Sequence, residues 1–368
     1  MTVHSDQSEL RWLRPPLLPD AITRPVTRGF EHGGAHTMRG DDMVKSIGLI
    51  IPQRAALFEV ATLPELLQLA PAAESSGFFD TVWVGDSLTS KARAESIACL
   101  GALAGLTESL RLAVGCMASF PIRDPALFAY QWASLDEISG GRMLLAVCNG
   151  LQKRDGASEK EGGHFGGVPD KHRAARLEEF IDLVRLLWTG DPVTFHGRFA
   201  DYDDIQILPT PTQRPCPIWI SANPPAGPAA ERVLTRVATK TDGLLTVRAR
   251  PGYIADTTSA LEQYLITAGR DPAAFPVAAY HSINIGPNAD TCLDEAQRFF
   301  DNYYGPGMFD RAGAEAMTAV GSPEQCVEQL QQVVSEGANH LALRLASWNQ
   351  REQLDLLIDK VLPALVTD

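Results

Sequence analysis

Side chains that could bind or transform a small molecule follow short apolar runs at four places in this sequence. These places are Asp86-Ser87, Cys116-Met117-Ala118-Ser119, Cys148-Asn149-Gly150 and Ser221-Ala222-Asn223. The carboxylate of Asp86 could exchange a proton, or it could cap a helix or form a structural ion pair. The thiol of Cys148 could react with a bound ligand or be buried as a small apolar group. We therefore expect a polar small-molecule site built from the ends of strands.

Two segments are suited to an anionic group such as phosphate. Ser221 and Asn223 stand between an apolar run and a helical pattern, and the N–H groups at a helix N-terminus attract anions. The glycine-rich segment 162–167 contains His164, Phe165 and Gly166, and glycines let the backbone approach a ligand closely. The first segment is the better candidate because of its position at a helix N-terminus, and the second is also typical of a flexible lid.

The elements that must position these residues alternate between strand and helix. Eight apolar runs are predicted to be strands, namely Ser46–Ile51, Thr81–Gly85, Arg111–Met117, Arg142–Val147, Pro217–Ser221, Gly243–Val247, Val277–Ile285 and His340–Ala346. A helical pattern follows each run. Eight successive β-then-α units predict an α/β fold, a (β/α)8 TIM barrel, whose site lies at the carboxyl ends of the strands. A doubly wound open sheet is the alternative.

Two insertions interrupt the predicted barrel. After the fourth strand, residues 149–171 are rich in glycine and charge, which is typical of a lid or ligand loop. Before the fifth strand, residues 191–215 contain two β-rich runs around His196-Gly197, which predict a hairpin at the rim.

The eighth strand places a charge inside the predicted barrel. Leucines 341, 343 and 345 share the face that should pack on helices, so Arg344 and Trp348 should face the interior. A buried arginine is rarely unpaired, so Arg344 should pair with an interior carboxylate or bind an anionic group. Trp348, Trp219 and Phe120 are candidate walls of an apolar substrate pocket, although such aromatic residues can also serve packing alone.

The composition excludes several classes of function. The net charge of -13 argues against nucleic acid or an anionic membrane surface as the main partner. The six cysteines include no Cys-x-x-Cys pair, so we expect reduced thiols in a cytoplasmic protein and no structural metal site. No apolar run reaches membrane-spanning length.

The domain organisation is predicted to be an irregular extension followed by one barrel. Residues 1–44 mix Arg, Pro, Gly, Asp and His with little periodicity, and strand-like patterning begins at Lys45. We assign residues 45–368 to the barrel. The histidines of the extension have no acidic partner at a fixed spacing, so we assign them no metal.

Six segments in order carry a family pattern. They are Ser75–Asp86, Thr107–Gly115, Trp132–Arg142, Leu177–Trp188, Phe195–Phe199 and Pro217–Ser221. From about Lys45 to the C-terminus, the chain resembles the bacterial luciferase-like family of flavin-dependent oxidoreductases and monooxygenases. The resemblance implies a TIM barrel that binds FMN or the deazaflavin F420 at the strand ends, and it implies a homodimer.

The resemblance also implies roles for individual residues. Met117, Ala118 and Ser119 should lie under the cofactor ring, with Met117–Ala118 matching a cis peptide bond of the family. Cys148 should face the ring, and Asn149 stands where luciferases carry a phosphate-binding arginine. The loop with His164, Phe165 and Gly166 should meet the cofactor phosphate, as should Ser221, Ala222 and Asn223.

One departure from the family bears on mechanism. Ser87 stands where luciferases carry a catalytic histidine after the second strand, and a serine cannot act as a base near neutral pH without help. Asp86 is the nearest ionisable group. A proton transfer of the luciferase type is therefore not implied for this chain.

The first functional hypothesis is a monooxygenase that uses reduced FMN and O2 on a small organic substrate. Because no Gly-x-Gly-x-x-Gly segment follows a strand, a separate flavin reductase should supply the reduced FMN as a transient partner. The alternatives are an F420-dependent hydride-transfer oxidoreductase and a barrel that binds a flavin or another small molecule without turnover.

A chain that begins at Met43 should fold and retain cofactor binding, because residues 1–44 lack the periodicity of the barrel. Soluble yield and cofactor titration of the shortened chain test this expectation. Loss of soluble protein would show that the extension belongs to the core or to an oligomer interface.

Overall fold

The computed structural model describes residues 44–150, 156–225 and 227–367. The expected extension, residues 1–44, therefore lies outside the described residues except for Val44. Within the described ranges, none of the helices combines the length and the apolar composition needed to cross a bilayer.

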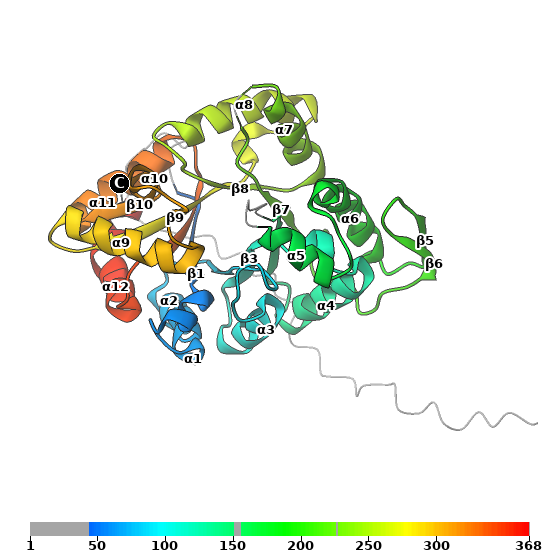
Figure 1. Ribbon diagram of the computed structural model, residues 1–368, viewed down its shortest axis with the longest axis horizontal. Coiled ribbons are helices and arrows are strands. Elements are labelled where there is room, and N and C mark those ends of the chain that lie inside the picture. Colours follow the sequence, from blue (N-terminus) through cyan, green and yellow to red (C-terminus); the bar gives the residue numbers. More distant parts are fainter. Residues whose placement is uncertain (1–43, 151–155, 226, 368) are drawn as a thin grey trace, which may run out of the picture. The chain divides into compact units, whose positions relative to one another are not determined.

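Eight parallel strands close into a barrel (Figure 1). In order around the barrel they are β1 (Ser46–Ile51), β2 (Thr81–Val84), β3 (Arg111–Met117), β4 (Met143–Val147), β7 (Ile218–Ser221), β8 (Leu244–Val247), β9 (Val277–Ile285) and β11 (His340–Leu345). Pairing of β8 with β9 and of β11 with β1 completes the ring. The predicted (β/α)8 barrel is confirmed, and the open-sheet alternative is wrong because no free edge remains between these strands.

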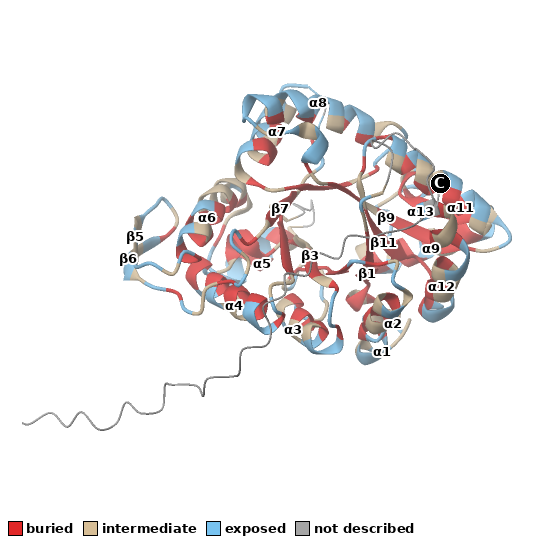
Figure 2. Cartoon of the chain, turned by 180° about the vertical axis from the view of Figure 1, so that it is seen from behind, coloured by how far each residue is buried: buried red, intermediate tan, exposed pale blue. Residues whose placement is uncertain are grey.

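Helices surround the strands and bury one face each against them (Figure 2). They are α1 (Leu63–Leu67), α2 (Leu69–Ser76), α3 (Ser96–Leu106), α4 (Pro125–Ile138), α6 (Arg173–Leu187), α7 (Ala229–Lys240), α8 (Tyr253–Thr267), α9 (Ala289–Tyr304), α11 (Pro323–Ser335), α12 (Gln350–Leu356) and α13 (Leu362–Thr367). Short helical turns are η1 (Gln53–Phe58), η2 (Phe120–Ile122), η3 (Asp170–His172), η4 (Pro272–Ala274) and η5 (Leu357–Val361).

The rim insertion has the predicted form. β5 (Val193–His196) and β6 (Asp201–Ile205) pair antiparallel as a two-stranded hairpin. The carboxylate of Glu179 on α6 accepts hydrogen bonds from the N–H groups of residues 198–200 in the turn, which ties the hairpin to the barrel.

Three elements were not predicted from the sequence. α5 (Ala157–His164) lies within the segment expected to be a glycine-rich lid, while α10 (Arg311–Ala316) and β10 (Thr318–Gly321) lie between two predicted helices. Glycine disfavours a helix interior, so α5 has little intrinsic propensity and depends on its tertiary contacts. β10 is a four-residue strand that pairs with the end of β9, and such a short run has no clear period.

The unit from β3 to β4 shows how local sequence sets the chain direction. Asp124 caps α4, and Pro125 occupies the first turn, where no N–H donor is needed. Gly140 and Gly141 follow the helix with φ values of 71° and 83°, a left-handed conformation that ends a helix and that glycine adopts without strain.

The rings of two tryptophans fill part of the barrel interior. The rings of Trp83 and Trp219 lie 6.0 Å apart and pack among small residues such as Ala113 and Ala146. A side chain at residue 243, which directly precedes β8, would overlap the ring of Trp219, so this position needs glycine. The filled interior leaves the strand ends as the place for a ligand.

Replacing Arg142 with methionine should lower the free energy of unfolding by about 2–4 kcal/mol. Its guanidinium donates hydrogen bonds to the carbonyl oxygens of Ser139 (2.7 Å), Leu110 (2.9 Å) and Ala104 (3.0 Å), which joins the end of α3 to the starts of β3 and β4. Urea denaturation measures the change. The matched control is Arg351→Met, which removes an exposed helix pair with Asp355 and should change stability by less than about 0.5 kcal/mol. Equal effects of the two substitutions would contradict the assigned role of Arg142.

Candidate active site

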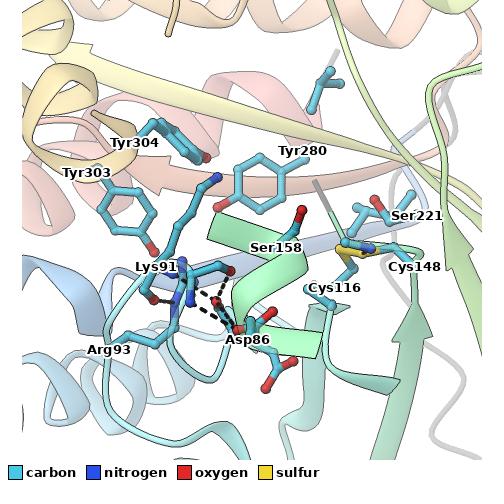
Figure 3. Close-up of a pocket in the computed structure, with 18 of the residues that line it drawn as sticks. Asp86, Lys91, Arg93, Cys116, Cys148, Ser158, Ser221, Tyr280, Tyr303 and Tyr304 are labelled. Carbon is cyan, nitrogen blue, oxygen red and sulfur yellow. Dashed lines mark hydrogen bonds between the residues drawn. A yellow bond between two sulfur atoms is a disulfide. The ribbon is translucent and has the colours of Figure 1, made fainter. Parts of the chain in front are cut away.

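A pocket of about 870 Å³, open to solvent, lies at the carboxyl ends of the barrel strands (Figure 3). Its lining comes from the loop after β2, from β3, β4, β7 and β8 and the residues that follow them, from Tyr280 within β9, and from α5, α6 and α9. The site is therefore where the barrel prediction places it.

Asp86, at the end of β2, is held by its neighbours. Its carboxylate accepts hydrogen bonds from the backbone N–H (2.7 Å) and hydroxyl (2.6 Å) of Ser119 and from the hydroxyl of Ser96 (2.8 Å). Arg123 adds an ion pair at 3.4 Å. These contacts occupy most of the acceptor positions of a carboxylate. Asp86 thus forms the structural ion pair that the sequence left open as one of its roles.

Ser87 and the residues after it are bound by a glutamate from α5. Oε1 of Glu161 accepts hydrogen bonds from the Ser87 hydroxyl (3.0 Å) and from the N–H groups of Leu88 (2.7 Å), Thr89 (2.8 Å) and Ser90 (3.1 Å). Burial by itself would raise the pKa of Glu161, but the hydrogen bonds outweigh burial and the pKa is lowered. Glu161 could not be predicted from the sequence, because its partners are distant in the chain.

Arg173 is a fully buried cation at the wall of the pocket. It contacts Asp170 at 2.8 Å, lies 3.8 Å from the carboxylate of Glu161 and donates to the carbonyl oxygen of Ser158 at 2.6 Å. Its Nη1 has no hydrogen-bond partner among the described residues. A Cβ placed on Gly150, which lines the pocket, would lie 3.0 Å from this nitrogen. Arg173 therefore keeps a donor without a described partner, buried directly behind Gly150 of the pocket wall.

Two further cations line the pocket near α9. The ammonium of Lys91 lies 4.8 Å from the ring centre of Tyr304, and the guanidinium of Arg93 lies 5.6 Å from that of Tyr303. The two lining carboxylates, Asp86 and Glu161, already accept several hydrogen bonds each. The charge of the pocket therefore suits an anionic ligand.

Arg344 lies inside the barrel as predicted, but its partners differ from the expected carboxylate. It donates hydrogen bonds to the hydroxyls of Tyr304 (2.7 Å), Ser282 (3.1 Å) and Tyr280 (3.3 Å). No carboxylate pairs with it in the described part of the chain, and five aromatic rings surround it, those of Tyr280, Phe299, Phe300, Tyr303 and Tyr304. Burial alone would lower the pKa of Arg344, but the tyrosines outweigh burial and the pKa is raised.

The cis peptide bond at the end of β3 lies elsewhere than expected. It joins Gly115 and Cys116, so the prediction of Met117–Ala118 is wrong. The pairing of β3 with β4 shifts register between Gly115 and Met117, and this irregularity comes earlier than the family pattern suggested. Met117 is buried in the layer between strands and helices, while Cys116 and Ala118 line the pocket.

The expectation of six reduced thiols is also wrong. A disulfide joins Cys116 and Cys148, whose Cα atoms lie 5.9 Å apart, and both residues line the pocket. The two cysteines are far apart in sequence, but Cys116 lies near the end of β3 and Cys148 directly follows β4, and these two strands are paired. Spacing along the chain could not reveal this pair.

The predicted phosphate segment after β7 is only partly in the pocket. Ser221 lines it, and the N–H of Ala222 donates to the carbonyl oxygen of Leu245 at 3.1 Å. Oδ1 of Asn223 accepts hydrogen bonds from the hydroxyl of Thr246 and the N–H of Val247, both at 3.1 Å. α7 starts only at Ala229, so the segment precedes the helix N-terminus instead of forming it.

The other predicted site residues lie outside the described lining. Phe120 packs in the core against Phe128 and Phe180, Trp219 lies in the barrel interior, and Trp348 packs against Phe58 and Phe299. Three residues of the glycine-rich loop are exposed to solvent, namely His164, Phe165 and Gly166. Asn149 is half-buried, and its Oδ1 has no partner among the described residues.

A cofactor with a flat ring and an anionic side chain fits these residues. Gly115, Ala118 and Gly150 leave the floor of the pocket without bulky side chains. The partnerless Nη1 of Arg173 supplies a donor for an anion. The same features suit FMN and F420, since both combine a tricyclic ring with a phosphate-bearing chain.

The fold and site define a (β/α)8-barrel protein with a candidate ligand pocket at the strand ends. Residues 43–340 match the luciferase-like monooxygenase family. The chain therefore belongs to this family and is a luciferase-like oxidoreductase.

Proteins similar to this chain include F420-dependent dehydrogenases and a monooxygenase. An F420-dependent glucose-6-phosphate dehydrogenase of Nakamurella multipartita is 27% identical over 325 residues, which cover 82% of this chain and 92% of that protein. A solved F420-dependent secondary alcohol dehydrogenase superposes with a TM-score of 0.73 at 20% identity, covering 88% of this chain and 99% of that one. A long-chain alkane monooxygenase superposes with a TM-score of 0.67 at 14% identity, covering 87% and 90%. The two solved structures support the barrel fold.

Replacing Glu161 with glutamine should lower the free energy of unfolding by about 1–3 kcal/mol at pH 7, because it removes the charge that Ser87 to Ser90 and Arg173 surround. The folded-state pKa lies below the ordinary value of 4.5, so this stabilisation is complete above that pH and is lost as the pH falls through the folded-state pKa. Urea denaturation from pH 7 to pH 3 should show the difference between wild type and variant shrinking. Glu328→Gln, on the exposed face of α11, is the control and should show no such change. A difference that does not depend on pH would contradict the account.

Proposed function

We propose that this protein is an F420-dependent oxidoreductase that transfers a hydride to or from a small organic substrate. The observation that carries the proposal is the match to F420-dependent dehydrogenases over 82% of the chain. The positive wall of the pocket supports it, because F420 carries an anionic side chain.

Four residues are proposed to hold the cofactor. Cys116, Ala118 and Gly150 form the floor against which the ring would lie. The free donor of Arg173 would bind an anionic oxygen of the side chain. When bound, F420 supplies a two-electron hydride carrier that resists oxygen.

The protein side chains then bind and orient the substrate. The Ser87 hydroxyl donates a hydrogen bond to Glu161, so it does not replace the histidine that luciferases carry at this place. The ionisable lining groups near α9 are Lys91, Arg93 and the phenols of Tyr280, Tyr303 and Tyr304. Such donors suit a substrate oxygen at the carbon that gains or loses hydride.

An FMN-dependent monooxygenase is the second candidate, favoured by the description of the matching family. It would need a separate reductase to supply reduced FMN, whereas hydride transfer from a substrate to oxidised F420 would need no such partner. Titration of the purified protein with F420 and with FMN, each oxidised and reduced, separates the two. The proposal expects F420 to bind at least about tenfold more tightly, which equals about 1.4 kcal/mol. Tighter binding of reduced FMN would favour the monooxygenase.

Replacing Asn223 with aspartate should weaken cofactor binding by about 1–3 kcal/mol, because it adds a negative charge beside Val247, which lines the pocket, and the side chain of F420 is anionic. The substitution keeps the oxygen that accepts hydrogen bonds from Thr246 and Val247, so the fold should survive. Fluorescence titration with F420 measures the change. Gln332→Glu, which adds the same charge on exposed α11, should leave the affinity unaltered. An unchanged affinity in Asn223→Asp would place the cofactor phosphate elsewhere.

A further inference from the structure

The six cysteines divide into two groups with different surroundings. Cys99, Cys216, Cys292 and Cys326 are free thiols buried in the protein. Burial raises the pKa of Cys99 to about 11 and those of Cys216 and Cys326 to about 12, and it also raises the pKa of Cys292. Such thiols carry almost no thiolate near neutral pH and react slowly.

Cys116 and Cys148 have the opposite surroundings. Both are partly exposed and line the solvent-open pocket, and Figure 3 shows their disulfide among the other lining side chains. A small thiol that enters the pocket can therefore reach the bridge without unfolding of the barrel.

The fold does not need this bridge. β3 and β4 are already joined by a parallel ladder from Leu112–Met143 to Met117–Val147, and α4 connects them. A disulfide between two neighbouring strands that are already paired adds little constraint to the folded barrel. The position of the bridge in the pocket is therefore better explained by chemistry there than by stability.

We propose that Cys116 and Cys148 form a redox-active pair that exchanges with small thiols entering the pocket. In the first step, a thiolate of the small thiol attacks Sγ of Cys116, a new sulfur–sulfur bond forms and Cys148 leaves as a thiolate. A second small thiolate then attacks the mixed disulfide and releases Cys116. The bridge gains two electrons and two protons, and two small thiols become one disulfide.

The backbone explains why Cys148 is the leaving sulfur. The N–H of Gly150 donates to Sγ of Cys148 at 3.4 Å, and this contact stabilises negative charge on that sulfur. Nη1 of Arg173, close to Gly150, adds positive potential on the same side. The exchange needs no cofactor, so the inference is independent of the proposed function.

Alkylation of the folded, cofactor-free protein tests the proposal. The protein is first oxidised with diamide, divided into samples with and without dithiothreitol, treated with iodoacetamide and analysed by peptide mass spectrometry. Without dithiothreitol, Cys116 and Cys148 should remain unlabelled. With dithiothreitol, both should label at least ~10-fold faster than the four buried cysteines. Labelling of the pair after diamide, or its resistance to dithiothreitol in the folded protein, would overturn the proposal.

Two variants test the direction of exchange. With cystamine as the probe, Cys148→Ser should form a mixed disulfide at Cys116 that persists, because no second thiol is present to resolve it. Cys99→Ser is the matched control, and in this variant Cys116 and Cys148 should behave as in wild type. Circular dichroism confirms folding of each variant, and the wild-type alkylation remains decisive if Cys148→Ser does not fold. Failure of Cys116 to react in a folded Cys148→Ser variant would contradict the proposed order of steps.

Discussion

Closure of the parallel sheet is the constraint on which the rest of the structure depends. Pairing of β8 with β9 and of β11 with β1 leaves the barrel interior enclosed, and the rings of Trp83 and Trp219 fill part of it. A ligand can then enter only from the strand ends. Cys116, Gly150 and Ser221 share one pocket for this reason, although they lie far apart in the sequence.

The distribution of charge in the pocket follows from how its carboxylates are used. Asp86 contacts Ser96, Ser119 and Arg123, and Glu161 accepts hydrogen bonds from the loop after β2. Both carboxylates therefore already have partners within the protein. Arg173 contacts two acids yet retains a donor without a described partner. An acidic chain with a net charge of -13 thus presents positive groups at the place where an anionic cofactor would bind.

The sequence was sufficient for the barrel because strand and helix periods are local properties. All eight barrel strands were predicted to within about one residue at each end, and a hairpin was predicted within the rim insertion, although without strand ends. Features that depend on contacts between distant segments were missed. α5 has a poor helical sequence and depends on Glu161, and the Cys116–Cys148 bridge appears only when β3 and β4 become neighbours.

Site residues were harder to predict than strands for a related reason. Strand alternation correctly turned Arg344 inward, but the choice between a carboxylate and other partners required the positions of Tyr280 and Tyr304 on other elements. Trp219 and Trp348 were candidates for the substrate wall because they follow or lie in strands. Their depth in the barrel and in the helix layer could not be read from residue type.

The reaction of bound reduced cofactor with oxygen tests the central claim most directly. Stopped-flow mixing of the protein, reduced FMN and aerated buffer is compared with the same mixture without protein, and the experiment is repeated with reduced F420. The F420 account predicts that the protein leaves the rate of FMN oxidation unchanged, while reduced F420 binds tightly and keeps its electrons in air. Slower appearance of oxidised FMN in the presence of the protein, together with no binding of F420, would contradict the account.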